Sequence, residues 1–410
     1  MKVWLKLALG TTIGLLLGLF LPQPVDGSVH ILTSFSELLI TMGRYILFPF
    51  IFFSTAVAVN ALRRDKVFAR VFFRSFLFMA GATIILVVLG ALFIILFSPK
   101  GLGMFSTRSV VTIDHLWNET LSKVFNTNAF QILTQGGNFL LPVYVLSFIL
   151  GLHLDFDRDS TGPTISLFDS LSRVLYHVNS FFIELLGFAM IILASAWIIQ
   201  IRLIQDISVY SEVILVLALA SILIIFGILP LAIYIFGGRK APFRPLFALL
   251  GVSIGAFFTG DSFFSLGLLT RFTRENLGVP RKAGAVTLPL FTMFSRGGTA
   301  LVTVLAFFVI LKSYAKLDVT LEQFFWTIFF SFILSFTLPS VPVAGPYVSL
   351  IILGELYGLG LDRGFLLMQP IIPLMASFAT LLDAVTTGVI AHLVSYQAGL
   401  SKSIQSKLFI

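Results

Sequence analysis

The sequence predicts an all-α polytopic membrane protein with eight transmembrane helices and two re-entrant helical hairpins. Of its 410 residues, 58% are hydrophobic and only 11% are charged, whereas soluble domains carry about 25% charged residues. Apolar stretches of about 20 residues or more, long enough to cross a bilayer as helices, recur along the chain. They lie near residues 4–21, 33–62, 70–97, 136–153, 169–200, 208–236, 283–313 and 364–398.

Two shorter apolar segments, near 242–278 and 324–360, are interrupted by glycine, serine or proline. In the second, Pro339, Pro342 and Pro346 cannot share one continuous helix. Each half of such a segment is too short to cross about 30 Å of hydrocarbon. Two half-helices that meet at a polar tip, buried in protein, satisfy both constraints. Because each interrupted segment precedes a full helix, residues 242–313 and 324–398 are predicted to form an inverted repeat around a transport site.

The charge pattern indicates membrane topology rather than nucleic-acid binding. The net charge is +8, but the lysines and arginines cluster in loops that share one side if the spans alternate, as the positive-inside rule expects. Because no Ala-x-Ala-like site follows the first apolar stretch, we expect a retained first helix with a cytoplasmic N-terminus. The predicted location is the cell inner membrane, with multiple spans. The sequence contains no cysteine, nucleophile–base pair or metal-ligand cluster that would indicate an enzyme.

Three charged residues are expected to converge between the hairpins and the last two full helices: Asp261, Arg296 and Asp383. Arg296 lies in an apolar stretch, and a guanidinium keeps its proton in proteins. It must therefore face a counter-charge, a ligand or a water-filled cavity. The two glycines that follow it predict an unwound turn, whose freed carbonyls could coordinate Na⁺ or bind substrate.

Two roles remain open for each of these charges. Arg296 either forms an internal salt bridge with Asp383 that only joins two helices, or contacts a ligand directly. Asp261, in the tip Thr259-Gly260-Asp261-Ser262, either caps a half-helix or contacts a ligand. The sequence alone does not choose between these roles.

The order and spacing of several short runs carry a resemblance to a known family. The runs are Thr287–Leu290, Gly298–Leu301, Val341–Gly345 and Asp383–Thr387. Together with the spans and hairpins, they resemble the dicarboxylate/amino acid:cation symporter family, the glutamate-transporter type, over nearly the whole chain. The resemblance implies a homotrimer that works by an elevator motion, with an unwound seventh helix.

The sequence departs from that family where its ligands bind. Ser295-Arg296-Gly297-Gly298-Thr299 stands where the family has Asn-Met-Asp-Gly-Thr, so two residues that contribute to sodium sites are replaced. In the last helix, only the sodium-linked aspartate remains, as Asp383. Two unit charges about 5 Å apart repel by several kcal/mol even at an effective dielectric constant near 20. Arg296 is therefore expected to replace at least one coupling ion and to offer its N–H groups to a substrate carboxylate.

The resemblance divides the chain into two parts. Residues 1–69 and 128–207 are expected to form mainly the scaffold and trimerisation domain. Residues 70–97 and 208–398 are expected to form mainly the transport domain, which comprises the first hairpin (242–278), helix seven (283–313), the second hairpin (324–360) and helix eight (364–398). Residues 399–410 are expected to form a cytoplasmic tail.

The predicted function is secondary active, symporter-like transport of a small organic anion or amino acid. The expected substrate-binding residues are Asp261, Ser262, Arg296, Gly298, Thr299, Val343, Ala344, Gly345, Ala376, Thr380 and Asp383. A sodium site is predicted at Ser295, Asp383 and the backbone near Thr292, Met293 and Phe294. No cofactor is expected beyond Na⁺ or H⁺ as a coupling ion, and the expected partners are substrate and membrane lipid, without nucleic acid.

Two alternatives stay open. One is a sodium-independent exchanger or uniporter of neutral amino acids, favoured by Phe263, Phe264, Met375 and Ala376 near the predicted site. The other is a ligand-gated conductance or binding protein of the same fold. Accumulation against a gradient separates transport from the second alternative, because a channel or sensor only equilibrates its ligand.

Overall fold

The computed structural model describes residues 2–20, 26–97, 139–155, 158–204, 206–238, 241–315, 320–338, 341–358 and 361–410. Within these ranges the chain is mainly helical and forms no β-strand, so the predicted all-α class is confirmed. Seven helices of the described part are long and apolar enough to cross a membrane. The predicted span at 136–153 corresponds to the shorter helix α7 (Leu141–His153), and its residues before 139 lie outside the described part.

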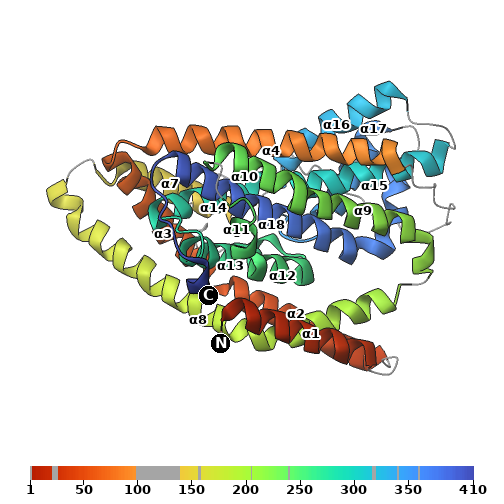
Figure 1. The fold of residues 1–410 in the computed structure, drawn as a ribbon, viewed down its shortest axis with the longest axis horizontal. Coiled ribbons are helices and arrows are strands. Elements are labelled where there is room, and N and C mark those ends of the chain that lie inside the picture. Colours follow the sequence, from red (N-terminus) through yellow and green to blue (C-terminus); the bar gives the residue numbers. More distant parts are fainter. Residues whose placement is uncertain are drawn as a thin grey trace.

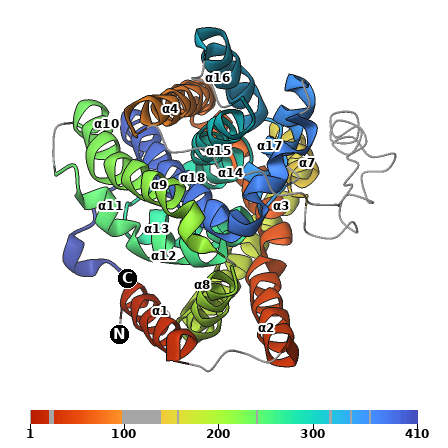
Figure 2. The ribbon, with the colours of Figure 1, turned by 90° about the vertical axis from the view of Figure 1, so that its right-hand side faces the viewer.

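The first helix packs closely along the longest one (Figures 1 and 2). Helix α1 (Val3–Phe20) lies against α8 (Arg158–Arg202) through Gly10, Gly14 and Gly18. A Cβ atom at Gly10 would lie only 2.0 Å from the carbonyl oxygen of Gly187. Small residues at this spacing let two helix backbones approach each other, as is common between membrane helices.

Two of the predicted spans are interrupted in ways the apolar pattern does not show. The span at 33–62 consists of α2 (Asp26–Tyr45) and α3 (Leu47–Arg64), with Pro49 in the first turn of α3. The span at 208–236 consists of α9 (Ser211–Leu223), a π-turn (Ile224–Ile228) and α10 (Leu229–Phe236). Pro230 has no N–H to donate to the preceding turn, and this accounts for the irregular hydrogen bonding there. Helix α4 (Phe68–Phe97) is continuous.

Both predicted hairpins consist of half-helices. The first hairpin contains α11 (Arg244–Ala248), α12 (Leu250–Thr259) and α13 (Ser262–Glu275). The second contains α16 (Leu321–Ser335) and α17 (Gly345–Tyr357). The longest of these helices has 15 residues, whereas about 20 are needed to span a bilayer.

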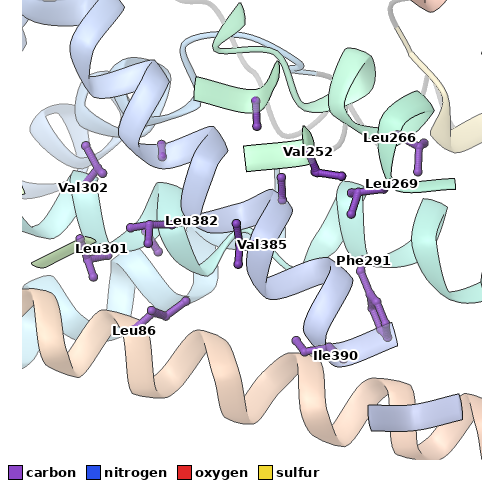
Figure 3. Packing of buried hydrophobic residues seen from close by; sticks show 14 of the residues in the cluster. Leu86, Val252, Leu266, Leu269, Phe291, Leu301, Val302, Leu382, Val385 and Ile390 are labelled. Carbon is purple, nitrogen blue, oxygen red and sulfur yellow. The ribbon is translucent and has the colours of Figure 1, made fainter. Parts of the chain in front are cut away.

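Each hairpin is followed by a long helix near the centre of the molecule (Figure 2). The first is followed by α14 (Arg281–Phe294) and α15 (Gly297–Ala315). Almost all residues in the most apolar stretch of these two helices are buried. The second is followed by a 3₁₀ segment (Leu361–Ile371) and α18 (Ile372–Gln397). Leu382 and Val385 of α18 belong to the buried core between α4 and the first hairpin (Figure 3).

The residues after α18 fold back onto the base of the first hairpin. The backbone N–H of Lys402 donates to the carbonyl oxygen of Gly278 at 3.0 Å, and that of Ile410 donates to Asn276 Oδ1 at 3.0 Å. Phe409 is buried. The segment predicted as a tail therefore packs against residues of the first hairpin.

Candidate functional site

The helix predicted at 283–313 is broken at Arg296. Helix α14 ends at Phe294, Ser295 and Arg296 lie outside any helix, and α15 begins at Gly297. The predicted unwound turn is present, but it precedes the two glycines rather than including them. Their role is close packing: a Cβ atom would lie 2.6 Å from Leu86 Cδ1 at Gly297, and 2.5 Å from Leu382 Cβ at Gly298.

Asp383, which lies on α18, caps the N-terminus of α15. Its Oδ1 accepts from the backbone N–H groups of Gly298 at 2.6 Å and Thr299 at 3.2 Å, and its Oδ2 accepts from Thr299 Oγ1 at 2.6 Å. The first N–H groups of a helix lack partners within the helix, and the helix dipole favours an anion there. A carboxylate on α18 therefore stabilises the N-terminus of α15 and joins the two helices across the break.

Arg296 is buried, and two of its three guanidinium nitrogens have no hydrogen-bond partner in the described part of the chain. Its side chain is among the largest fully buried ones, with 1% exposure. Its Nε and Nη2 atoms have no hydrogen-bond partner in the described part of the chain. The carboxylate of Asp383 is instead occupied by the backbone and Thr299. The two roles left open by the sequence, an internal salt bridge and direct ligand contact, both stay predictions.

The tips of the two hairpins meet beside Arg296. Asp261 and Val343 form an isolated antiparallel bridge, and the N–H of Ser262 donates to the carbonyl oxygen of Pro342 at 3.0 Å. Helix α17 then begins at Gly345, where a Cβ atom would lie 3.2 Å from Arg296 Nη1. Arg296 therefore contacts the second tip at a residue that has no side chain.

Asp261 is a helix cap, one of the two roles left open by the sequence. Its Oδ1 accepts from the N–H groups of Phe263 and Phe264, each at 2.9 Å, at the start of α13. Its Oδ2 forms an ion pair with Nη2 of Arg44, and Asp261 is fully buried. Asp261 thus pairs with α2 and not with Arg296, although the tip that carries it meets the second tip beside Arg296.

Arg44 is the residue that the sequence interpretation missed. It follows Thr41-Met42-Gly43 within the apolar stretch 33–62. The argument that singled out Arg296, a charge inside an apolar span that needs a partner, applies equally to Arg44 and could have found it.

A small polar cavity lies beside Asp383. It measures about 10 Å³, and its lining includes Asp383 and five hydroxyl-bearing residues, Ser262, Ser265, Thr292, Thr380 and Thr387, beside Leu269 and Ala384. Such a volume holds about one water molecule. Hydroxyl and carboxylate oxygens such as these are the ligands that hard cations prefer, although the described residues contain no group of three or more His, Cys, Asp or Glu that could hold a metal ion.

The remaining predicted residues lie around these contacts. Ala376 of α18 lies under the first tip, because a Cβ atom at Gly260 would be 3.3 Å from Ala376 Cβ. Val343 is 42% exposed, so the second tip faces outward on one side. Of the predicted sodium ligands, Thr292 lines the small cavity and Ser295 Oγ is buried without a partner in the described part. Met293 is buried and Phe294 is half-buried.

This arrangement, two interrupted hairpins whose tips meet over a broken helix with buried charges, is that of a secondary transporter. The sequence model of the sodium:dicarboxylate symporter family matches residues 3–397, and the chain belongs to that family. It is therefore a transporter-family protein and not an enzyme. A curated relative, the "Proton/sodium-glutamate symport protein" of Geobacillus stearothermophilus, is 22% identical over 325 residues, which cover 76% of each chain.

The two roles of Asp261 can be separated by substitution. Asp261→Asn is expected to keep the helix cap, because asparagine caps about as well as aspartate, but to lose the ion pair with Arg44. Asp261→Ala should lose both and therefore lower the melting temperature further. Thermal unfolding of both variants, each with and without Arg44→Gln, measures the coupling free energy between Asp261 and Arg44. If Arg44→Gln lowers stability equally in the wild type and in Asp261→Asn, the two residues are not coupled.

Proposed function

We propose that the protein is a secondary active transporter of a small organic anion and that Arg296 binds the substrate carboxylate. The observation that carries this proposal is the complete burial of a guanidinium whose Nε and Nη2 have no protein partner. A buried cation without hydrogen bonds is costly. A carboxylate can accept two parallel N–H bonds from an arginine, so a bound anion removes that cost.

Two helix N-termini reinforce the preference for an anion. Helices α15 and α17 both begin next to Arg296, and helix N-termini carry a partial positive charge. Asp383 already caps α15. Helix α17 has no side-chain cap, so its first turn is the one suited to a ligand anion. The carboxylate would then lie between Arg296 and the tip of the second hairpin.

The same arginine bears on ion coupling. A fixed cation next to Asp383 occupies the electrostatic role of a bound cation, so we propose that sodium coupling is reduced or replaced. The small hydroxyl-lined cavity is the best remaining place for a coupling cation, because Asp383, Thr292 and Thr380 supply hard oxygen atoms there. The named relative is a proton/sodium symporter, which makes both H⁺ and Na⁺ reasonable candidates.

Substrate entry requires the second tip to move. The cavity beside Asp383 is far too small for an organic anion. The second tip is joined to the first by the Asp261–Val343 bridge and the Ser262–Pro342 hydrogen bond. We therefore propose that residues 341–347 open to admit substrate. The elevator motion, the division into scaffold and transport domains, the homotrimer and the location in the inner membrane remain parts of this proposal.

The alternative of a neutral amino acid carrier has less support. It drew on Phe263, Phe264, Met375 and Ala376 near the predicted site. Met375 is buried, and Ala376 lies under the first tip. Phe264 instead packs against α2, where a Cβ atom at Gly43 would lie 2.5 Å from its ring. Both phenylalanines are buried, and Phe264 serves the contact between the hairpin and α2.

Ligand binding and transport test the proposal together. Purified protein is melted with dicarboxylates, acidic amino acids and neutral amino acids, each with and without Na⁺, since a ligand of the folded state raises the melting temperature. We expect carboxylate anions to stabilise the protein and neutral amino acids to have no effect. Proteoliposomes should then accumulate the active anion against its gradient. Stabilisation by neutral amino acids alone would contradict the role of Arg296, and equilibration without accumulation would contradict active transport.

A further inference from the structure

We propose a second anion site, distinct from the one at Arg296, that binds a phosphate group. A cavity of about 450 Å³ lies where α3 and α8 meet the end of α13 and the start of α14. Its lining includes Arg173 and Tyr176 of α8, Arg274 of α13, and Arg281 and Lys282 of α14. The hydrogen bonds, ion pairs and ring contacts described for these residues do not involve Arg296 or the hairpin tips.

The cavity carries an excess of positive charge. Of its lining residues, four are arginine or lysine, and Asp169 is the one carboxylate. Asp169 is shared between two of the cations: its Oδ2 accepts from Arg173 Nε at 2.8 Å, and its Oδ1 pairs with Arg281 Nη2. Lys282 pairs with Asp65, which lies outside the lining. One carboxylate thus serves two guanidinium groups, which leaves N–H donors on both.

Arg274 is held in a position suited to a ligand. Its guanidinium carbon lies 4.1 Å from the centre of the Tyr176 ring. The tyrosine is fixed in turn, because its hydroxyl donates to Glu275 Oε1 at 2.6 Å. Stacking on a ring uses the face of the guanidinium and leaves its N–H edge for an acceptor. Preorganised planar forks of this kind match the geometry of phosphate oxygens.

The position of the cavity indicates where the phosphate comes from. Lys282 and Asp65 join two of the basic loops that the charge pattern places on the cytoplasmic side. Anionic lipid headgroups are concentrated on that side and attract clustered lysine and arginine. A lipid headgroup and a soluble phosphate share the same chemistry, so the experiment has to separate them.

The test titrates purified full-length protein with three water-soluble probes at constant ionic strength. They are dihexanoyl phosphatidylglycerol, dihexanoyl phosphatidylcholine and inorganic phosphate. Each probe is scored by the change in melting temperature relative to the same variant without it. We compare the wild type with the double variant Arg173→Gln/Arg274→Gln. Arg70→Gln is the matched control, because Arg70 is an exposed arginine of α4 outside the cavity.

We expect phosphatidylglycerol to raise the melting temperature of the wild type more than phosphatidylcholine does. For the same change in melting temperature, the double variant should need a phosphatidylglycerol concentration at least roughly tenfold higher. Arg70→Gln should behave like the wild type. A shift with phosphatidylglycerol alone assigns a lipid headgroup, and an equal shift with inorganic phosphate assigns a soluble ligand. Equal shifts in the wild type and the double variant, or no shift with any probe, would overturn the site.

Discussion

Replacing Arg296 with methionine is expected to abolish binding of the substrate anion while leaving the protein at least as stable as before. The side chain is buried, and its Nε and Nη2 have no protein partner. Removing an unsatisfied buried donor relieves a cost instead of breaking a bond. Binding, in contrast, loses a buried charge-assisted contact worth about 2–5 kcal/mol, which corresponds to roughly 30-fold or more in affinity. The melting temperature of the sample reports its stability, and ligand titration of the same sample reports its affinity.

Arg271 provides the matched control for this experiment. It is another buried arginine, but its terminal nitrogens are hydrogen-bonded: Nη2 donates to Glu184 Oε1 at 2.7 Å and Nη1 to the carbonyl oxygen of Ser180 at 2.9 Å. Its Nε lies 3.4 Å from Glu275 Oε1 in an ion pair. Arg271→Met should therefore lower the melting temperature and leave ligand affinity unchanged. Arg296→Lys should bind weakly, since lysine keeps the charge but loses the planar fork. A loss of stability in Arg296→Met with unchanged affinity would identify Arg296 as a structural ion.

Substituting Gly298 with alanine is expected to destabilise the protein and abolish transport. A Cβ atom there would lie 2.5 Å from Leu382 Cβ, 2.8 Å from the carbonyl oxygen of Ala379 and 2.9 Å from the backbone nitrogen of Asp383. Two of these are backbone atoms, so α15 and α18 have to separate. Overpacking of this kind costs about 1–3 kcal/mol, and the shift also disturbs the hydrogen bond from Gly298 to Asp383. Thermal unfolding and proteoliposome uptake measure the two effects.

Gly284→Ala is the corresponding control. Gly284 lies within α14, and a Cβ atom there would have its nearest neighbours at 3.5 and 3.7 Å, which is ordinary contact. Alanine in a helix interior is more stable than glycine by about 0.5–1 kcal/mol. This variant should melt at or above the wild-type temperature and keep its transport. If both variants behave alike, close packing between α15 and α18 is not what Gly298 provides.

The long elements and the breaks in them could be predicted from the sequence for a simple reason. Apolar length defines a membrane helix, and proline or paired glycine marks where one is interrupted. Both hairpins and the break at Arg296 follow from these signals. Pro49 marks the break between α2 and α3 as well, but the apolar stretch continues through it, so the prediction joined the two helices.

Contacts between distant residues were harder to predict. Sequence alone placed Asp383 near the broken helix, but it could not show that backbone N–H groups would satisfy the carboxylate and leave Arg296 without a partner. That outcome depends on ångström-scale distances between α15 and α18. The role of Gly297 and Gly298 was misassigned for the same reason, because a glycine needed for close packing looks identical in sequence to one needed for flexibility.

The ion pair between Arg44 and Asp261 has a kinetic consequence. In the proposed elevator motion, Arg44 stays with α2 while Asp261 travels with the first hairpin. Each excursion must then separate two charges, of which one is fully buried, and leaving a buried charge without its partner is strongly unfavourable. This penalty applies whether or not cargo is bound. The dwell time of the empty carrier in the described conformation would thus be set partly by the ion pair between α2 and the first hairpin, and weakening that ion pair would shorten it.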